Sequence, residues 1–197
     1  MMDYISGKLI RKQPTHLVLE TGGIGYYINI SLNTFSQLPA EGTGNVKIMT
    51  YLSIKEDAHT LFGFFEEGER TLFGHLISVS GIGPGTGRMI LSSMNPAEIG
   101  QAIAQGDIQA LQRIKGIGAK SAQRIILEIQ DKVKKETYNL SNFNPVNNTV
   151  KDEALQALIT LGFVKNLGQK ALERVLEENP EGSLPLDKLI KLALKHL

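Results

Sequence analysis

The chain has 197 residues, of which 42% are hydrophobic, so it is long enough and apolar enough to form one large domain or a few small ones. Its formal net charge of +1 excludes overall basicity as a means of binding nucleic acid, so any such binding would depend on a local arrangement of charge. It has no cysteine, which excludes disulfide bonds, thiolate zinc sites and cysteine nucleophiles.

Residues 1–65 have the pattern of short β-strands separated by turns. Runs rich in β-branched, aromatic and aliphatic residues alternate with turn clusters such as residues 21–25. Strands in this number and length indicate a small barrel, and composition alone favours an OB-fold only slightly over an SH3-like barrel. The expected strands span residues 4–10, 16–20, 26–30, 46–53 and 61–65.

Residues 66–136 change to the periodicity of helices. Leu72, Leu76 and Val79 fall at helical spacing. Residues 95–98, Asn-Pro-Ala-Glu, have the residues of a helix start, with Asn95 as the N-cap and proline in the first turn. The segment is therefore expected to form helix, hairpin, helix twice, with a connecting helix between. The helices that follow the first are expected at 86–94, from 95, at 108–114 and from 119 to about 135.

A Gly-Ile-Gly turn occurs twice in this segment, each time before a helix. Gly81 and Gly116 are 35 residues apart, and so are Gly83 and Gly118, which indicates a duplicated unit. Glycines allow a tight turn, and the first turn of the following helix presents unpaired amides that bind anions. The isoleucine between the glycines is expected to point inward and hold the hairpin on the core.

Cations surround the second copy, where Arg113, Lys115, Lys120 and Arg124 lie within a few residues of the glycines. Amides and cations together favour binding of a phosphate group, and a phosphate contact does not depend on the base sequence. A Walker A loop is excluded because Ala119 stands where its glycine should be, and a dinucleotide-binding loop lacks its third glycine. The candidate DNA-contacting residues are Gly81, Ile82, Gly83, Pro84, Gly85, Thr86, Arg88, Lys115, Gly116, Ile117, Gly118, Ala119, Lys120, Ser121 and Arg124, together with Lys55.

The C-terminal part divides into a linker and a small helical module. Residues 137–149 contain five asparagines and few apolar residues, which predicts a flexible linker. Residues 150–197 carry three apolar helical stripes, which predicts a three-helix module. These stripes are expected mainly to form the hydrophobic core of the module. Because the module is small, tethered and without catalytic groups, we also expect it to dock to a partner.

The paired hairpins, placed between a β-rich segment and a small helical module, resemble the RuvA family over essentially the whole chain. The resemblance implies an OB-fold barrel at 1–65, a tandem helix-hairpin-helix domain at 66–136, the linker at 137–149 and a motor-docking domain at 150–197. It implies binding of four-way (Holliday) junction DNA and stimulation of a RuvB-type AAA+ ATPase in recombination and repair. It also implies a homotetramer, a RuvC-type resolvase as a further partner, and no cofactor of its own, with ATP and Mg used by the motor.

The resemblance assigns roles to residues outside the hairpins. The loop carrying Glu56 and Asp57 would otherwise be a solvated hairpin tip. In the family it is an acidic pin near the meeting point of the junction arms, where negative charge would repel phosphates and steer strands apart while Lys55 could hold one. The motor-docking positions that carry over are Leu158, Leu161, Phe163 and Leu194.

Two other functions stay open at this point. A DNA glycosylase or lyase also uses such a hairpin, with Lys120 as a conceivable nucleophile, but the expected aspartate after the following helix is missing. In a scaffold protein without a DNA role, the hairpins would serve only as turns.

Gly85 and Ala119 stand where such hairpins often carry lysine. Amide contacts are therefore expected to contribute a larger share of the DNA-binding energy here. The absence of a basic, apolar leader and of a long apolar stretch predicts a cytoplasmic protein without a membrane span.

Overall fold

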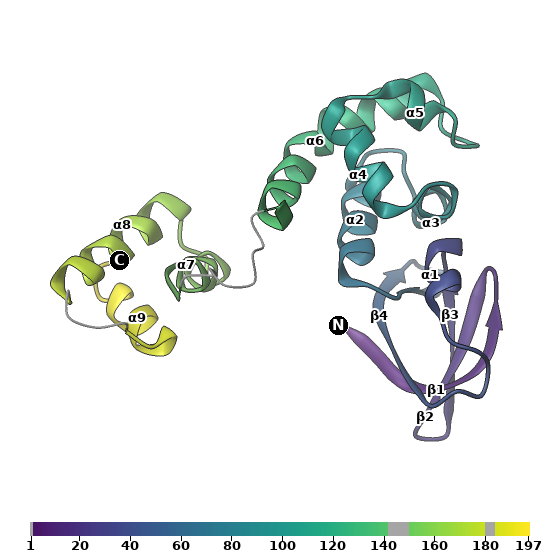
Figure 1. The fold of residues 1–197 in the computed structure, drawn as a ribbon, viewed down its shortest axis with the longest axis horizontal. Helices are drawn as coiled ribbons and strands as arrows, with labels where there is room; N and C mark the ends of the chain where they lie inside the picture. The colour runs from purple at the N-terminus through teal and green to yellow at the C-terminus, as the bar shows by residue number, and fades with distance from the viewer. Residues whose placement is uncertain (1, 142–149, 180–183) are drawn as a thin grey trace. The chain divides into compact units, whose positions relative to one another are not determined.

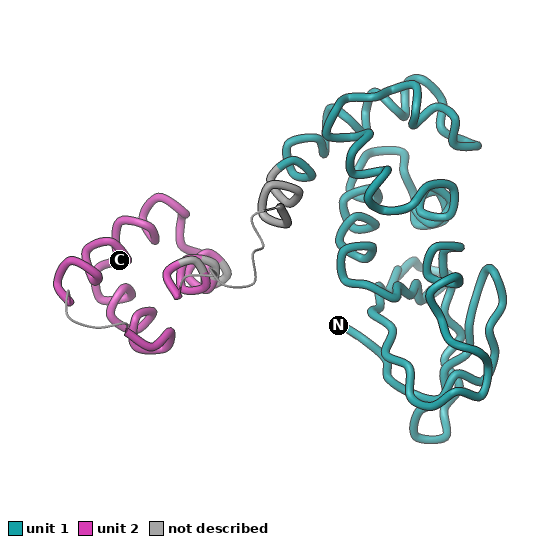
Figure 2. The backbone as a smooth tube through the Cα atoms, in the orientation of Figure 1, with its two compact units in different colours: residues 1–138 teal, residues 139–197 magenta. Residues whose placement is uncertain are grey.

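The computed structural model describes residues 2–141, 150–179 and 184–197. The chain forms two compact units, Met1–Tyr138 and Asn139–Leu197 (Figure 2). The first contains the barrel and the helices that carry both hairpins, and the second contains the C-terminal helices (Figure 1).

The N-terminal segment forms a closed barrel. Its strands are ordered β1-β2-β3-β5-β4, with β3 and β5 parallel and the other pairs antiparallel. In the first strand, Ile5 and Leu9 point into the barrel and Tyr4 and Lys8 point outward, as period-two alternation requires. This five-stranded order is that of an OB-fold, so the SH3-like alternative is excluded. The strands are β1 (Tyr4–Gln13), β2 (His16–Thr21), β3 (Ile24–Ile30), β4 (Asn45–Ile54) and β5 (His59–Phe64).

A short helix between β3 and β4 was absent from the sequence prediction. Helix α1 (Leu32–Gln37) is capped by Ser31, whose hydroxyl accepts a hydrogen bond from the Thr34 amide at 3.0 Å. With six residues, α1 is too short for the apolar periodicity of a helix to stand out in the sequence.

The helices after the barrel pack against its strand β5, while the interior of the barrel forms a hydrophobic cluster of its own. Phe73 of α2 (Glu67–Ser78) lies with its ring centroid 4.9 Å from that of Phe64 and 5.3 Å from that of Phe62, both on β5. The side chains of these three residues belong to the same buried cluster as the helices after α2. The change from strands to helices near residue 65 is therefore a boundary of secondary structure inside one compact unit.

A buried carboxyl connects α2 to α1. The side chain of Glu69 is 1% exposed, and its two oxygens accept hydrogen bonds from the hydroxyls of Ser31 and Thr34, the latter at 2.7 Å. The Thr34 hydroxyl in turn accepts a hydrogen bond from the Phe65 amide at 3.1 Å. Burial raises the pKa of Glu69 above its usual value of 4.5, against the opposing effect of these hydrogen bonds.

This raised pKa gives the stability of the first unit a defined pH dependence. The unfolded carboxyl releases its proton at a lower pH than the folded one, so the contribution of Glu69 is most favourable below pH 4.5 and declines as the pH rises through the folded pKa. The unfolding free energy of the wild type, minus that of Glu69→Gln, should therefore fall with rising pH in chemical denaturation. Glu69→Ala should cost about 1–3 kcal/mol for each hydroxyl left without its acceptor. Glu20→Gln, which removes an exposed barrel carboxylate, is the control. If the difference in unfolding free energy from the wild type is independent of pH for both Gln variants, the raised pKa of Glu69 is contradicted.

One helix after α2 begins and ends at the residues that its cap chemistry predicts. Helix α4 (Pro96–Gln105) starts with a complete capping box, in which Asn95 and Glu98 exchange side-chain and backbone hydrogen bonds. It ends at Gly106, whose φ of 73° is left-handed. The remaining helices of the unit are α3 (Pro84–Ser93), α5 (Ile108–Gln112) and α6 (Ala119–Ser141).

The linker prediction is wrong at its N-terminal end. Helix α6 continues to Ser141, so residues 137–141 are helical. No proline or glycine occurs between Gly118 and Pro145, and asparagines lower helix propensity by too little to end a helix that is already formed. The rest of the predicted linker, 142–149, lies outside the described residues.

The second unit is a three-helix module, as predicted. Its core includes Ala154 and Leu158 of α7 (Val150–Thr160), Leu172 and Val175 of α8 (Lys165–Glu178), and Leu189 of α9 (Leu186–Ala193). Gly168 allows α7 and α8 to approach closely, because a Cβ there would lie 3.3 Å from a methyl of Leu155. In the parts of the chain that the structure describes, no helix is both long and apolar enough to cross a membrane.

Candidate nucleic-acid interface

The two Gly-Ile-Gly turns have the same backbone conformation. Gly81 has a φ of 89° and Gly116 a φ of 88°, a left-handed region that side-chain-bearing residues rarely adopt. Ile82 and Ile117 are each 5% exposed and belong to the core. The predicted inward plug is therefore confirmed, and the prediction that these two side chains contact DNA is wrong. The amides of both isoleucines donate at 3.0 Å to carbonyls three residues earlier. The 35-residue repeat is thus a repeat of structure.

Both turns lead directly into a helix. Helix α3 begins at Pro84 with Gly83 as its N-cap, and α6 begins at Ala119. The amides of Gly87 and Ala122 donate at 2.9 Å to the carbonyls of Gly83 and Gly118, so the amides between them belong to the open first turn. Around Gly83, Gly85 and Gly118 there is open space where a Cβ would be. An anion can therefore approach both helix starts closely.

The cations are distributed unequally between the two hairpins. Arg113, Lys115 and Lys120 are exposed at the second hairpin. The first hairpin, residues 80–86, contains no Lys or Arg. Arg124 was expected to serve the second hairpin, but its guanidinium donates to the Ser80 carbonyl of the first at 2.8 Å. The fold thus brings the two hairpins together through a residue of α6.

Arg88 has a different environment from the one predicted. Its Nη1 donates to the Thr15 carbonyl at 3.1 Å and to the Asn29 side-chain oxygen at 3.0 Å. Both partners lie on the barrel, and the Asn29 amide group also donates to the Leu61 carbonyl at 3.2 Å. Arg88 therefore joins α3 to the barrel. The sequence prediction had grouped it with the hairpin because the two are close along the chain.

The acidic residues lie at the tip of the β4–β5 hairpin. The strands remain paired up to Ile54 and His59, and the Lys55 amide donates to the Ala58 carbonyl at 2.9 Å. Glu56 and Asp57 occupy the turn itself, and both are exposed together with Lys55. A short turn at the end of two paired strands gives these charges a fixed place on the barrel.

The prediction that Leu158 contacts a docked partner is wrong. It is fully buried in the core of the second unit, where its side chain packs beside Gly168 of α8. The spacing of the apolar residues along α7 does not show which of them the neighbouring helices cover. Leu161 is 61% exposed and Leu194 39%, whereas Phe163 is half-buried. Val164 and Leu167 at the start of α8 are also exposed, and they follow Leu161 at intervals of three residues.

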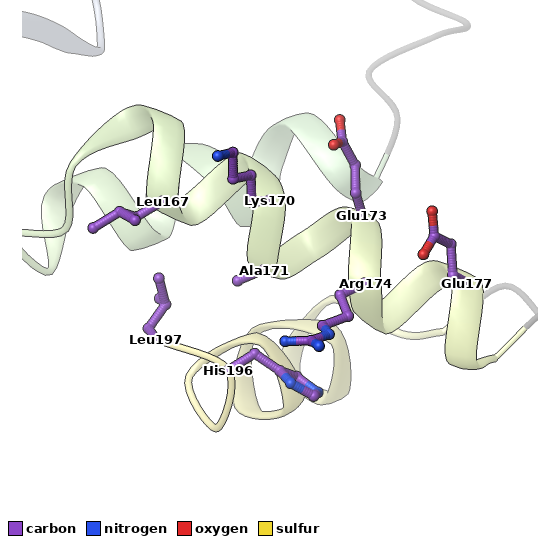
Figure 3. Close-up of a pocket in the computed structure, with 8 residues that line it drawn as sticks. All are labelled: Leu167, Lys170, Ala171, Glu173, Arg174, Glu177, His196 and Leu197. Carbon is purple, nitrogen blue, oxygen red and sulfur yellow. The ribbon is translucent and has the colours of Figure 1, made fainter.

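A shallow hollow lies on the second unit between α8 and the C-terminal residues (Figure 3). Its walls carry charges of both signs, including Lys170 and Glu173, and Arg174 lies beside His196. Hydrogen bonds from Gln169 and Lys151 lower the pKa of Glu173. This arrangement is that of a solvated ion-pair surface. In the described residues, no group of three or more histidines or acidic residues is placed to hold a metal ion.

Comparison with known proteins agrees with this architecture segment by segment. The family model described as RuvA N terminal domain matches residues 1–63, which are the barrel. The model described as SAM-like Helix-hairpin-helix tandem matches residues 73–131, which include both hairpins. The model described as RuvA, C-terminal domain matches residues 149–197.

Full-length relatives carry the same name. A protein of Cytophaga hutchinsonii called Holliday junction branch migration complex subunit RuvA is 52% identical over 99% of both chains. The chain belongs to the RuvA family. RuvA proteins of the same description from Christiangramia forsetii and Flavobacterium psychrophilum are 49% and 46% identical over the full length of both chains. Because the match to RuvA proteins covers the full length of the chain, it supports neither the glycosylase nor the scaffold alternative.

Proposed function

We propose that this RuvA-family chain binds four-way junction DNA through its two hairpins, without reading base sequence, as the non-catalytic subunit of a branch-migration complex. The observation that carries the proposal is the matched pair of helix starts, each open to an anion and held on the core by a buried isoleucine. Two such sites on one compact unit can hold two phosphates at a set separation, which suits a structure-specific contact.

The exposed carboxylates of the β4–β5 turn supply the opposite sign of charge. Glu56 and Asp57 would repel phosphates that approach the tip, whereas the cations of the second hairpin attract them. Attraction at the hairpins and repulsion at the tip disfavour a continuous duplex and favour separated arms. Lys55, which is exposed beside the carboxylates, would hold a phosphate at the edge of that repulsive region.

The second unit is proposed to dock a RuvB-type AAA+ ATPase. Leu161, Val164, Leu167 and Leu194 are exposed apolar side chains on a small module that has a core of its own. ATP and Mg are used by the motor, and this chain contributes DNA and motor binding. A homotetramer, a RuvC-type resolvase as a further partner and action in the cytoplasm complete the proposal.

The direct test compares affinities for a four-way junction and for a linear duplex of the same base composition across a salt series. The junction should bind more tightly at every salt concentration and without dependence on base sequence. The log of its affinity should fall with the log of the salt concentration, with a slope of about −0.9 for each phosphate neutralised. Native mass spectrometry with and without the junction gives the stoichiometry. Equal affinity for the two DNAs would refute structure-specific binding.

Reversing the acidic tip should reduce the preference for junctions. Glu56→Lys with Asp57→Lys should tighten duplex binding about tenfold and steepen its salt slope by roughly two, because two repulsive charges become attractive ones. Glu177→Lys with Asp187→Lys makes the same change in net charge on the second unit and is the control. If the tip variant keeps the wild-type ratio of junction to duplex affinity, the carboxylates do not act as a pin.

A further inference from the structure

The backbone of Ser80, the residue just before the first Gly-Ile-Gly turn, is bound on both sides by side chains of α6. Its carbonyl accepts a hydrogen bond from Nη1 of Arg124 at 2.8 Å, and its amide donates to Oε2 of Glu128 at 3.3 Å. The two side chains approach each other, with 3.9 Å between Nε of Arg124 and Oε1 of Glu128. Helix α6 belongs to the second hairpin, so the first hairpin is held by its repeat partner.

The corresponding contact at the second hairpin is apolar. The repeat places Met89 where Arg124 stands, since the two are 35 residues apart. The sulfur of Met89 lies 3.9 Å from the position that a Cβ on Gly116 would take, and the guanidinium of Arg124 lies 3.5 Å from the same position on Gly81. Each hairpin thus receives a side chain from the helix of the other. Only the first hairpin receives a charged one, and it is also the hairpin with no cation of its own.

We infer that Arg124 and Glu128 form a clamp that positions the first hairpin for phosphate binding, an inference that rests on the proposed DNA-binding function. Arg124 then has two effects, because it fixes the Ser80 carbonyl and brings positive charge to a turn that lacks it. Its side chain is 50% exposed, so that charge faces solvent as well as the backbone. Glu128 acts only through position, since a carboxylate gains nothing from a nearby phosphate.

The sign of the Glu128 effect separates a clamp from simple electrostatics. Removing a negative charge near a phosphate-binding surface should tighten DNA binding if charge alone matters. The clamp requires the opposite result. Glu128→Ala should weaken junction binding about threefold to tenfold, because the Ser80 amide loses its acceptor and the first hairpin loses a fixed position. Glu128→Gln keeps a side-chain oxygen for that amide and should retain most of the affinity.

Asp131→Ala is the matched control, because it removes an exposed carboxylate three residues further along the same helix. Its junction affinity should be equal to or higher than that of the wild type. The clamp is overturned if Glu128→Ala binds as tightly as Asp131→Ala, or if Glu128→Gln is as weak as Glu128→Ala.

A double-mutant cycle identifies the hairpin through which Arg124 acts. Arg124→Met installs the side chain that the repeat carries at position 89. Its loss of junction affinity should largely disappear in a Gly83→Asp background, where the first hairpin is already impaired, and persist in a Gly118→Asp background. The reverse pattern would show that Arg124 serves the second hairpin and would overturn the clamp.

Amide hydrogen exchange tests the clamp without DNA. Glu128→Ala should speed exchange at Ser80 and leave Lys115, its repeat equivalent, unchanged, whereas unchanged exchange at Ser80 would overturn the clamp even in a chain that binds junctions. A different outcome separates the two proposals. If Glu128→Ala speeds exchange at Ser80 but the wild type does not prefer junctions to duplex, the clamp is supported and the proposed function is refuted. Thermal melting of each variant confirms that the first unit is folded.

Discussion

A chain that carries both Gly83→Asp and Gly118→Asp is expected to lose junction affinity by on the order of 100-fold while staying folded, from about tenfold at each hairpin. Neither glycine has a left-handed φ, and neither has an atom within 4 Å of the position that a Cβ would take. Aspartate at a helix N-cap stabilises the helix, so the melting temperature should not fall. The added carboxylate occupies the anion position and repels a phosphate.

Serine at the same two positions is the matched control. Gly83→Ser with Gly118→Ser adds an N-cap side chain without charge, so it should cost much less affinity than the aspartate pair. Fluorescence anisotropy with a labelled four-way junction measures both, and thermal denaturation reports folding. Equal losses for the serine and aspartate pairs would point to steric exclusion, and no loss for either would show that the hairpins do not contact phosphate.

A chain that ends after Ser141 is expected to bind junctions within about threefold of the full-length chain and to lose all stimulation of its motor. The first unit keeps both of its hydrophobic clusters in this truncation, because the core of the second unit is built entirely from other residues. Cutting at Ser141 rather than at residue 136 preserves the whole of α6. Junction affinity and ATP-driven branch migration with the cognate motor are the two measurements.

A point variant in the intact chain separates docking from tethering. Val164→Asp with Leu167→Asp changes two exposed side chains at the start of α8 and should reduce motor stimulation without unfolding the module. Leu158→Asp, by contrast, places a charge in the core and should unfold the module. Branch migration by the truncated chain at the full-length rate would refute motor docking by the second unit.

Local patterns were sufficient to predict several features. Runs of strand-forming residues between turn clusters predicted all five strands to within a few residues. The capping box at residues 95–98 has the hydrogen bonds that its residue types require. The 35-residue spacing of the glycines predicted two equivalent turns, and Gly81 and Gly116 have nearly the same φ.

Side-chain partners distant in sequence were not predictable in this way. Arg88 lies next to a hairpin in the chain but bonds to barrel residues, and Arg124 follows the second hairpin but bonds to the first. Leu158 looked like any other apolar residue of an amphipathic helix until neighbouring helices covered it.

Residue types and their spacing are enough to specify the elements and the repeated turn that begins two of the helices. Glycine at a left-handed φ, an isoleucine plug and a helix start are properties of a few consecutive residues, so neighbouring residues suffice to specify them. The roles of Glu69 as a buried acceptor, and of Arg124 and Glu128 in binding Ser80, became visible in the folded chain alone. Those contacts join residues 35 to 48 positions apart, and which donor meets which acceptor at that range depends on how the helices pack on one another and on the barrel.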